Sequence, residues 1–130
     1  QESYGSIKCK DILLLGLAFK PGTDDIRESA SLKIIESLYK LETNITVHDP
    51  VALDNYKKYL GRNLPKIKTT TDWKACLDRN EIIIIATNWS EYKEISKLKS
   101  SAKLIFDCRR LLDPDEIKNS QYLTFGHNFS

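Results

Sequence analysis

Short apolar runs alternate with amphipathic segments along the whole chain, and this alternation is the strongest constraint on its fold. The strongest run is EIIIIA at residues 81–86, whose four consecutive isoleucines are β-branched and apolar. A strand that is apolar on both faces is typical of a parallel sheet covered by helices on both sides. The sequence therefore predicts an α/β domain in which residues 81–86 form a central strand.

Five further runs have the length and composition of strands, at residues 12–15, 45–48, 66–69, 104–106 and 122–125. Segments with helical character separate them. Alternation of strands and helices at this spacing produces a parallel sheet with right-handed crossovers. We expect a Rossmann-like three-layer domain with five to six parallel strands and helices on both faces.

Helical segments are predicted at residues 29–41, 52–60, 71–78 and 88–98. The first has apolar residues at helical spacing on one face. We expect Ser29 and Thr71 to cap the helices that follow them. Asn88 and Glu91 approximate a capping box, and Asp113 precedes a proline that suits the first turn of a short helix.

Ligands of parallel sheets bind beyond the carboxyl ends of the strands. The residues expected there are 19–27, Asp49, 87–89 and 107–110. Lys20 and the pair Arg109-Arg110 would face one crevice from two sides, which suits a phosphate or pyrophosphate. A surface salt bridge is the competing interpretation of the arginine pair.

Known phosphate-binding loops fit the segment from Gly16 to Gly22 poorly. Its spacing is neither GxGxxG nor GxxxxGK[ST], so spacing alone favours a structural loop between strand and helix. A signalling-receiver domain needs an Asp at the end of the third strand and a Lys at the end of the fifth. Here Asp49 ends the second strand and Lys103 begins its strand, so that arrangement is excluded. We also expect no metal site, because His48 and His127 lack partners at ligand spacing.

The cysteines suggest reduced thiols in a cytoplasmic protein. Cys9, Cys76 and Cys108 are odd in number and form no CxxC motif. Arginines beside Cys108 could lower the pKa of its thiol, but we favour a role as small buried filler. We predict no nucleic-acid or membrane partner, because 20 basic and 18 acidic side chains mix along the chain and no apolar run approaches the roughly 20 residues of a membrane helix.

The chain has no methionine. A complete gene product starts with one, so we expect this chain to be processed or excised from a longer protein. Residues 1–10 read as a linker or a cloning remnant, and residues 11–130 as the domain itself.

Four segments together resemble the C-terminal, UDP-binding domain of the UDP-glucose/GDP-mannose dehydrogenase family. They are GLAFKPGTDDIRES at 16–29, VHDP at 47–50, TNWSEY at 87–92 and FDCRRLLD at 106–113. The segments occur in the family's order and cover nearly the whole chain, and the first is long and highly specific.

The resemblance implies a role in oxidising the C6 hydroxyl of a nucleotide sugar to a carboxylate with NAD, a reaction of polysaccharide biosynthesis. Phe19, Lys20 and Arg109 match the residues that contact the nucleotide sugar. Arg27 matches the residue that reaches NAD across the cleft. NAD would be bound mainly by an N-terminal domain, and a central segment would form a homodimer; both lie outside this chain.

Chemistry is not expected from this chain alone. The family's nucleophilic cysteine lies in a glycine-rich central segment that has no counterpart here, so we assign no catalytic residue and expect the isolated chain to be inactive. Two alternatives remain open. One is a stand-alone nucleotide-binding or regulatory module without catalysis, and the other is a Rossmann domain of another dehydrogenase. The identity of the nucleotide sugar is also open.

Overall fold

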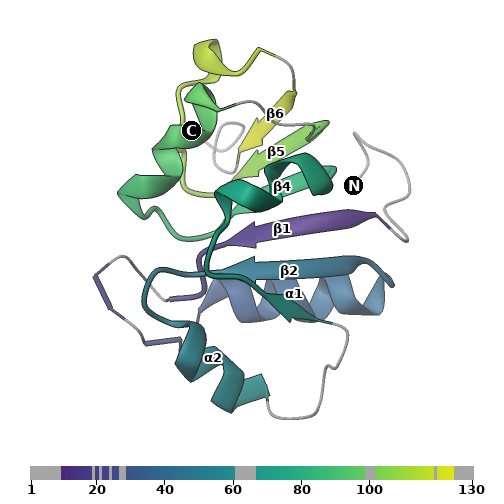
Figure 1. Ribbon diagram of the computed structural model, residues 1–130, viewed down its shortest axis with the longest axis vertical. Coiled ribbons are helices and arrows are strands. Elements are labelled where there is room, and N and C mark those ends of the chain that lie inside the picture. Colours follow the sequence, from purple (N-terminus) through teal and green to yellow (C-terminus); the bar gives the residue numbers. More distant parts are fainter. Residues whose placement is uncertain are drawn as a thin grey trace.

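The computed structural model describes residues 10–18, 20, 22–23, 25–26, 29–60, 67–98, 102–118 and 120–124. Its strands are β1 (Asp11–Leu15), β2 (Asn44–His48), β3 (Lys68–Thr69), β4 (Ile82–Ile85), β5 (Leu104–Asp107) and β6 (Gln121–Thr124). They form one sheet in the order β3-β2-β1-β4-β5-β6 (Figure 1). All neighbouring strands are parallel, which confirms the predicted fold class.

The predicted central strand lies inside the sheet, between β1 and β5. All four of its isoleucines are buried, and Ile82 pairs with Ile12 of β1 and with Leu104 of β5. Fully burying an aliphatic side chain contributes about 1.5–3 kcal/mol, so the run of isoleucines stabilises the centre of the sheet. Chain order reverses between β1 and β4, and this is the topological switch point of a doubly wound sheet.

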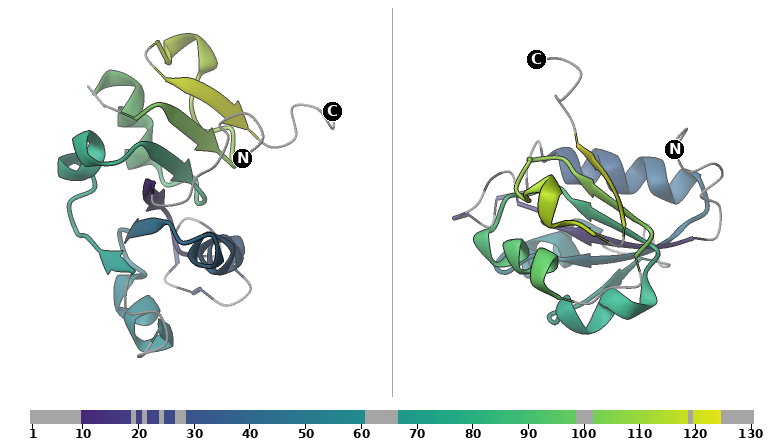
Figure 2. Two further views of the ribbon diagram at one scale, coloured as in Figure 1. Left: turned by 90° about the vertical axis from the view of Figure 1, so that its right-hand side faces the viewer. Right: turned by 90° about the horizontal axis from the view of Figure 1, so that it is seen from above.

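Helical segments cover both faces of the sheet. The α-helices are α1 (Ala30–Lys40) and α2 (Leu53–Leu60), and the 3₁₀ segments are η1 (Lys74–Arg79), η2 (Ser90–Lys97) and η3 (Pro114–Glu116). Figure 2 shows α1 on one face and the teal and green segments η1 and η2 on the other.

The core divides into two clusters according to the alternation of side chains along the strands. Ile12 and Leu14 of β1 pack with α1 and α2. Leu13 and Leu15, from the same strand, pack with η1 and η2 on the opposite face. This two-sided burial explains why the strands are continuous apolar runs rather than alternating ones.

The expected cap of α1 is confirmed. The Ser29 side chain accepts a hydrogen bond from the backbone N–H of Ser31, with 3.1 Å between the two atoms. The short helix expected to begin at Asp113-Pro114 is present as η3, and the Asp113 side chain caps it by accepting from the N–H of Asp115 at 3.0 Å.

Two other predicted caps are wrong. Thr71 does not cap the segment after β3; η1 has Trp73 at its N-cap position without a side-chain cap, and Asp72 Oδ1 accepts from the N–H of Ala75 at 3.3 Å. Asn88 and Glu91 form no capping box, since η2 begins at Ser90 without a side-chain cap. Glu91 instead accepts a hydrogen bond from the indole of Trp73 at 2.8 Å, so a tertiary partner replaces the local one.

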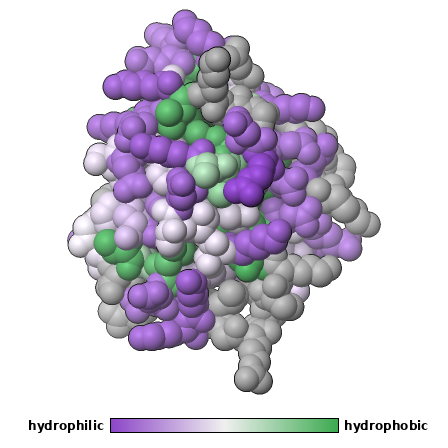
Figure 3. Space-filling view, in the orientation of Figure 1, coloured by the Kyte–Doolittle hydropathy of each residue, from purple (hydrophilic) through white to green (hydrophobic). Residues whose placement is uncertain are grey.

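The surface is mostly hydrophilic. The face in Figure 3 shows hydrophobic residues only in small separated groups, and the exposed large hydrophobic residues of the described chain are Leu41 and Val51. No helix in the described part of the chain is long and apolar enough to cross a membrane.

Candidate functional site

The candidate site lies at the carboxyl edge of the sheet, around the switch point between β1 and β4. Four connecting segments begin there, one after each of β1, β2, β4 and β5. Glycine is required after β1. Gly16 has a φ of +103°, and a Cβ at this position would lie 2.4 Å from the Cβ of Thr87. The chain leaving β1 therefore passes directly against the chain leaving β4.

Asp49, which follows β2, is a buried hydrogen-bond acceptor with 2% of its surface exposed. Its Oδ2 accepts from the N–H groups of Leu17 and Ala18 at 2.8 and 3.0 Å and from the indole of Trp89 at 3.1 Å. Its Oδ1 accepts from the N–H groups of Val51 and Ala52, both at 2.9 Å. One carboxylate thus joins the segments that follow β1, β2 and β4.

Thr87 is fully buried. Its hydroxyl donates to the carbonyl of Ala18 at 2.9 Å. The peptide groups on both sides of Ala18 are therefore held, the N–H by Asp49 and the C=O by Thr87. The exposed Lys20 lies two residues further along. We name this pair of contacts from Asp49 and Thr87 the Ala18 clamp.

Arg109, which follows β5, reaches back over the end of β4. Its Nε donates to the carbonyl of Ala86 at 2.9 Å, and its own N–H donates to Asp107 Oδ1 at 3.2 Å. The residue as a whole is exposed. Since Ala86 immediately precedes Thr87, Arg109 after β5 and the segment that leads from β1 toward Lys20 both contact the end of β4, the strand between β1 and β5.

A second buried carboxylate supports the arginine segment. Asp107 has no exposed surface, and its Oδ2 accepts from the N–H of Leu112 at 2.7 Å and from the hydroxyl of Tyr122 at 2.8 Å. Burial raises the pKa of Tyr122, and its hydrogen bond to Asp107 raises it further. The phenol therefore stays protonated and continues to donate. Next to Arg109, Arg110 has a left-handed backbone with φ of 54°.

Cys108 is filler rather than a nucleophile. Burial raises the pKa of its thiol to about 11, Asp107 adds to the rise, and Arg109 opposes it only in part. The arginines beside it in sequence therefore do not activate it. The thiol packs against the α1 side of the core, which agrees with the role expected from its position.

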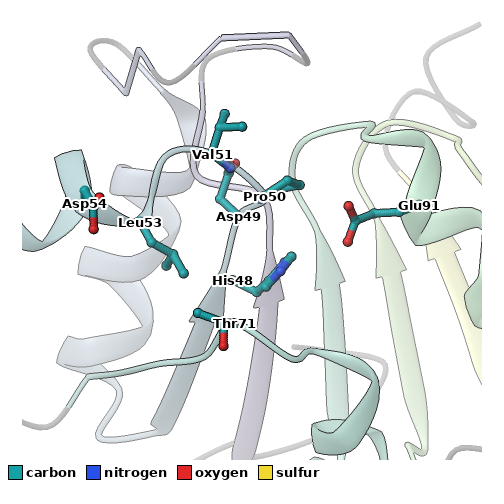
Figure 4. A pocket seen from close by; sticks show the side chains of 8 residues that line it. All are labelled: His48, Asp49, Pro50, Val51, Leu53, Asp54, Thr71 and Glu91. Carbon is teal, nitrogen blue, oxygen red and sulfur yellow. The ribbon is translucent and has the colours of Figure 1, made fainter.

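A pocket of about 410 Å³ opens beside this site, over the end of β2. In Figure 4, Glu91 lies across the pocket from Leu53 and Asp54, with His48 between them. His48 bonds through Nδ1 to the hydroxyl of Tyr92 at 2.9 Å, and burial lowers its pKa, so the imidazole is neutral near pH 7. The carboxylates on its walls make this pocket unsuitable for a pyrophosphate.

The sequence-predicted residues have three outcomes. Lys20 and Arg109 are exposed at the predicted edge. Phe19 and Arg27 lie outside the described residues. Asp49, expected among the ligand-facing residues, is instead buried beneath the rim of the site.

Sequence reasoning missed the structural roles of Asp49 and Thr87. The signal for Asp49 was its place between a strand end and a proline, where Asp side chains accept from nearby backbone N–H groups. For Thr87 we find no comparable local signal. Among the described residues, no group of three or more His, Cys, Asp and Glu side chains could hold a metal ion.

The sheet order defines a Rossmann-like α/β domain, a class in which ligands bind at the carboxyl edge of the sheet. Residues 13–114 match the model of the UDP binding domain of the UDP-glucose/GDP-mannose dehydrogenase family. The chain belongs to this family.

The relatives that the chain resembles in sequence include UDP-glucose 6-dehydrogenases. The chain is 36% identical over 119 residues to a UDP-glucose 6-dehydrogenase of Rickettsia conorii, covering 88% of the chain and 27% of that protein. It is 33% identical over 123 residues to UDP-glucose 6-dehydrogenase TuaD of Bacillus subtilis, covering 92% of the chain and 26% of TuaD. The chain thus spans about a quarter of these relatives.

Solved structures of dehydrogenases share the fold of this chain. A UDP-glucose dehydrogenase from Pyrobaculum islandicum superposes with a TM-score of 0.78 at 34% identity, covering 94% of this chain and 26% of that one. A GDP-mannose dehydrogenase from Pseudomonas aeruginosa shares the fold, with a TM-score of 0.68 at 20% identity over 90% of this chain and 28% of that one.

Proposed function

We propose that this chain is the nucleotide-sugar-binding domain of a longer, NAD-dependent nucleotide-sugar 6-dehydrogenase. What supports the proposal is that this domain of the family carries two exposed cations, Lys20 and Arg109, in the segments that follow β1 and β5 at the carboxyl edge of the sheet. The pyrophosphate of a UDP-sugar or GDP-mannose would lie between them, where two fixed cations offset its charge. Phe19 would line the same site and Arg27 would face NAD.

The residues after β1 do not fit the pyrophosphate of NAD. In a dinucleotide-binding turn, backbone N–H groups after the first strand are available to the phosphates. Here the N–H groups of Leu17 and Ala18 donate to the Asp49 carboxylate, and the N–H of Gly16 donates to the carbonyl of His48 at 2.7 Å. The Asp49 carboxylate and the His48 carbonyl thus occupy the N–H donors that the pyrophosphate of NAD would need.

We infer that NAD is bound mainly by an N-terminal domain outside this chain, and that the enzyme is a homodimer. The described cysteines, Cys76 and Cys108, also support the view that the oxidation takes place outside this chain. Cys76 is buried, so a substrate does not reach its sulfur. The thiol of Cys108 has its pKa raised to about 11, so it does not offer the thiolate that covalent oxidation would require. The role of this chain is to bind and orient the nucleotide sugar.

Calorimetric titration of the chain with UDP, UDP-glucose and GDP-mannose tests the proposal. A charge-assisted hydrogen bond contributes about 1.5–3 kcal/mol, so Lys20→Ala and Arg109→Ala should each weaken binding roughly ten- to a hundredfold. Arg109→Lys should also weaken binding, because a lysine cannot bind bidentately.

Matched controls are Lys33→Ala in α1 and Arg79→Ala in η1. Both remove an exposed cation outside the carboxyl-edge loops, so both should keep the parent affinity. Binding that is unchanged in the Lys20 and Arg109 variants, or lowered equally in all four, would show that the cations do not form this site.

A further inference from the structure

The segment that carries Lys20 is held by side chains from two other strand ends. Asp49 follows β2 and accepts from the N–H of Ala18. Thr87 follows β4 and donates to the C=O of Ala18. Their exposed fractions are 2% and 0%, so neither is positioned to contact a ligand. The contacts join residues 31 and 69 positions apart in the chain.

This arrangement fixes backbone rather than side chain. Thr87 packs closely against Gly16, and its hydroxyl donates a hydrogen bond to the Ala18 carbonyl at 2.9 Å. Both peptide groups of Ala18 are therefore held, and Lys20 follows two residues later in the chain. A ligand that binds a lysine on a pre-ordered loop loses less conformational entropy than one that must order the loop.

We propose that Asp49 and Thr87 are positioning residues, which hold the Ala18 peptide so that Lys20 is presented to the diphosphate of a nucleotide sugar. The proposal rests on the function proposed above for this edge of the sheet. It assigns a binding role to two residues that touch no ligand, acting through the Ala18 clamp.

Thr87→Val is the sharpest test, because it removes the hydroxyl and keeps the shape. The matched control is Thr43→Val. Thr43 is also buried, and its hydroxyl donates to the carbonyl of Leu38 at the same 2.9 Å. Thr43 directly precedes β2, so it lies at the opposite edge of the sheet. Both variants lose one buried hydroxyl–carbonyl hydrogen bond.

We expect the two variants to lower the melting temperature to a similar extent, while only Thr87→Val weakens UDP binding in calorimetry, by about tenfold. Thr87→Ser, which keeps the hydroxyl, should restore affinity to within about threefold of the parent chain. The positioning role is overturned if Thr87→Val binds UDP as tightly as Thr43→Val does.

Amide hydrogen exchange measured by NMR gives a second readout without ligand. The amides of Leu17 and Ala18 should exchange at least about tenfold faster in Thr87→Val than in Thr43→Val at matched stability. Equal exchange in the two variants would overturn the clamp. If the parent chain binds no UDP but the exchange difference appears, the proposed binding function fails and the clamp stands, so the two failures are distinguishable.

Discussion

Removing the Asp49 carboxylate should be among the most destabilising single changes in this domain. Three of its five donors belong to buried residues, the N–H groups of Leu17, Ala18 and Ala52. Each buried donor left without an acceptor costs about 1–3 kcal/mol. Asp49→Ala should therefore lower the free energy of unfolding by roughly 3–9 kcal/mol, toward the low end if water enters the vacated space.

Asp49→Asn should cost much less, for a reason specific to the geometry. The amide has a single oxygen, and it can be directed to the side where Leu17, Ala18 and Trp89 donate. Its NH₂ group then faces Val51 and Ala52, of which only Ala52 is buried. One orphaned buried donor corresponds to about 1–3 kcal/mol.

Urea unfolding followed by far-ultraviolet circular dichroism measures both variants. Asp72→Asn is the control, because Asp72 is exposed and accepts a single hydrogen bond that an amide oxygen can keep; it should change stability by less than about 0.5 kcal/mol. The reasoning is refuted if Asp49→Asn is as stable as the parent, or if Asp49→Ala costs no more than Asp49→Asn.

Two other positions give independent predictions. Gly16→Ala should lower the free energy of unfolding by more than about 3 kcal/mol in the same urea assay, because a left-handed backbone alone costs about 1–2 kcal/mol and the new Cβ would overlap Thr87. Gly22 is also at positive φ, but no described atom lies within 4 Å of the added Cβ, so Gly22→Ala should cost only about 1 kcal/mol. Equal losses of stability in the two variants would contradict the contact with Thr87. Cys108 should react with iodoacetamide at pH 8 about tenfold more slowly in the native than in the urea-unfolded chain, because a pKa near 11 instead of 9.0 reduces the thiolate more than the gain in nucleophilicity restores. Its native labelling rate, followed by peptide mass spectrometry, should rise steadily from pH 8 toward 11, and a plateau below pH 9 would contradict the raised pKa.

Local pattern was sufficient where burial alone decides the structure. The isoleucines at 82–85 must be covered on both faces, which places them at the centre of a parallel sheet. Ser29 capped its helix as predicted because its hydroxyl oxygen and the N–H that donates to it are only two residues apart in the sequence. Local pattern also predicted that Lys20 and Arg109 follow strands that the structure identifies as β1 and β5, and the carboxyl ends of parallel strands necessarily share one edge.

Local pattern was insufficient where a distant partner competes with a neighbour in sequence. Glu91 had a nearby helix start available but bonds the indole of Trp73, 18 residues away. The basic neighbours of Cys108 suggested a lowered pKa, yet burial raised it. Neither desolvation nor the choice between competing donors can be judged before the fold exists.

The sequence by itself determined the order of strands and helices, the family and the two cations, because these depend on periodicity and on long specific motifs. Only the tertiary structure decided what supports the cations. The Asp49 carboxylate joins three strand ends, and Thr87 reaches a carbonyl 69 residues away. Such contacts exist only after the sheet has assembled, because the strand register brings their atoms within hydrogen-bonding distance and burial excludes the water that would otherwise compete.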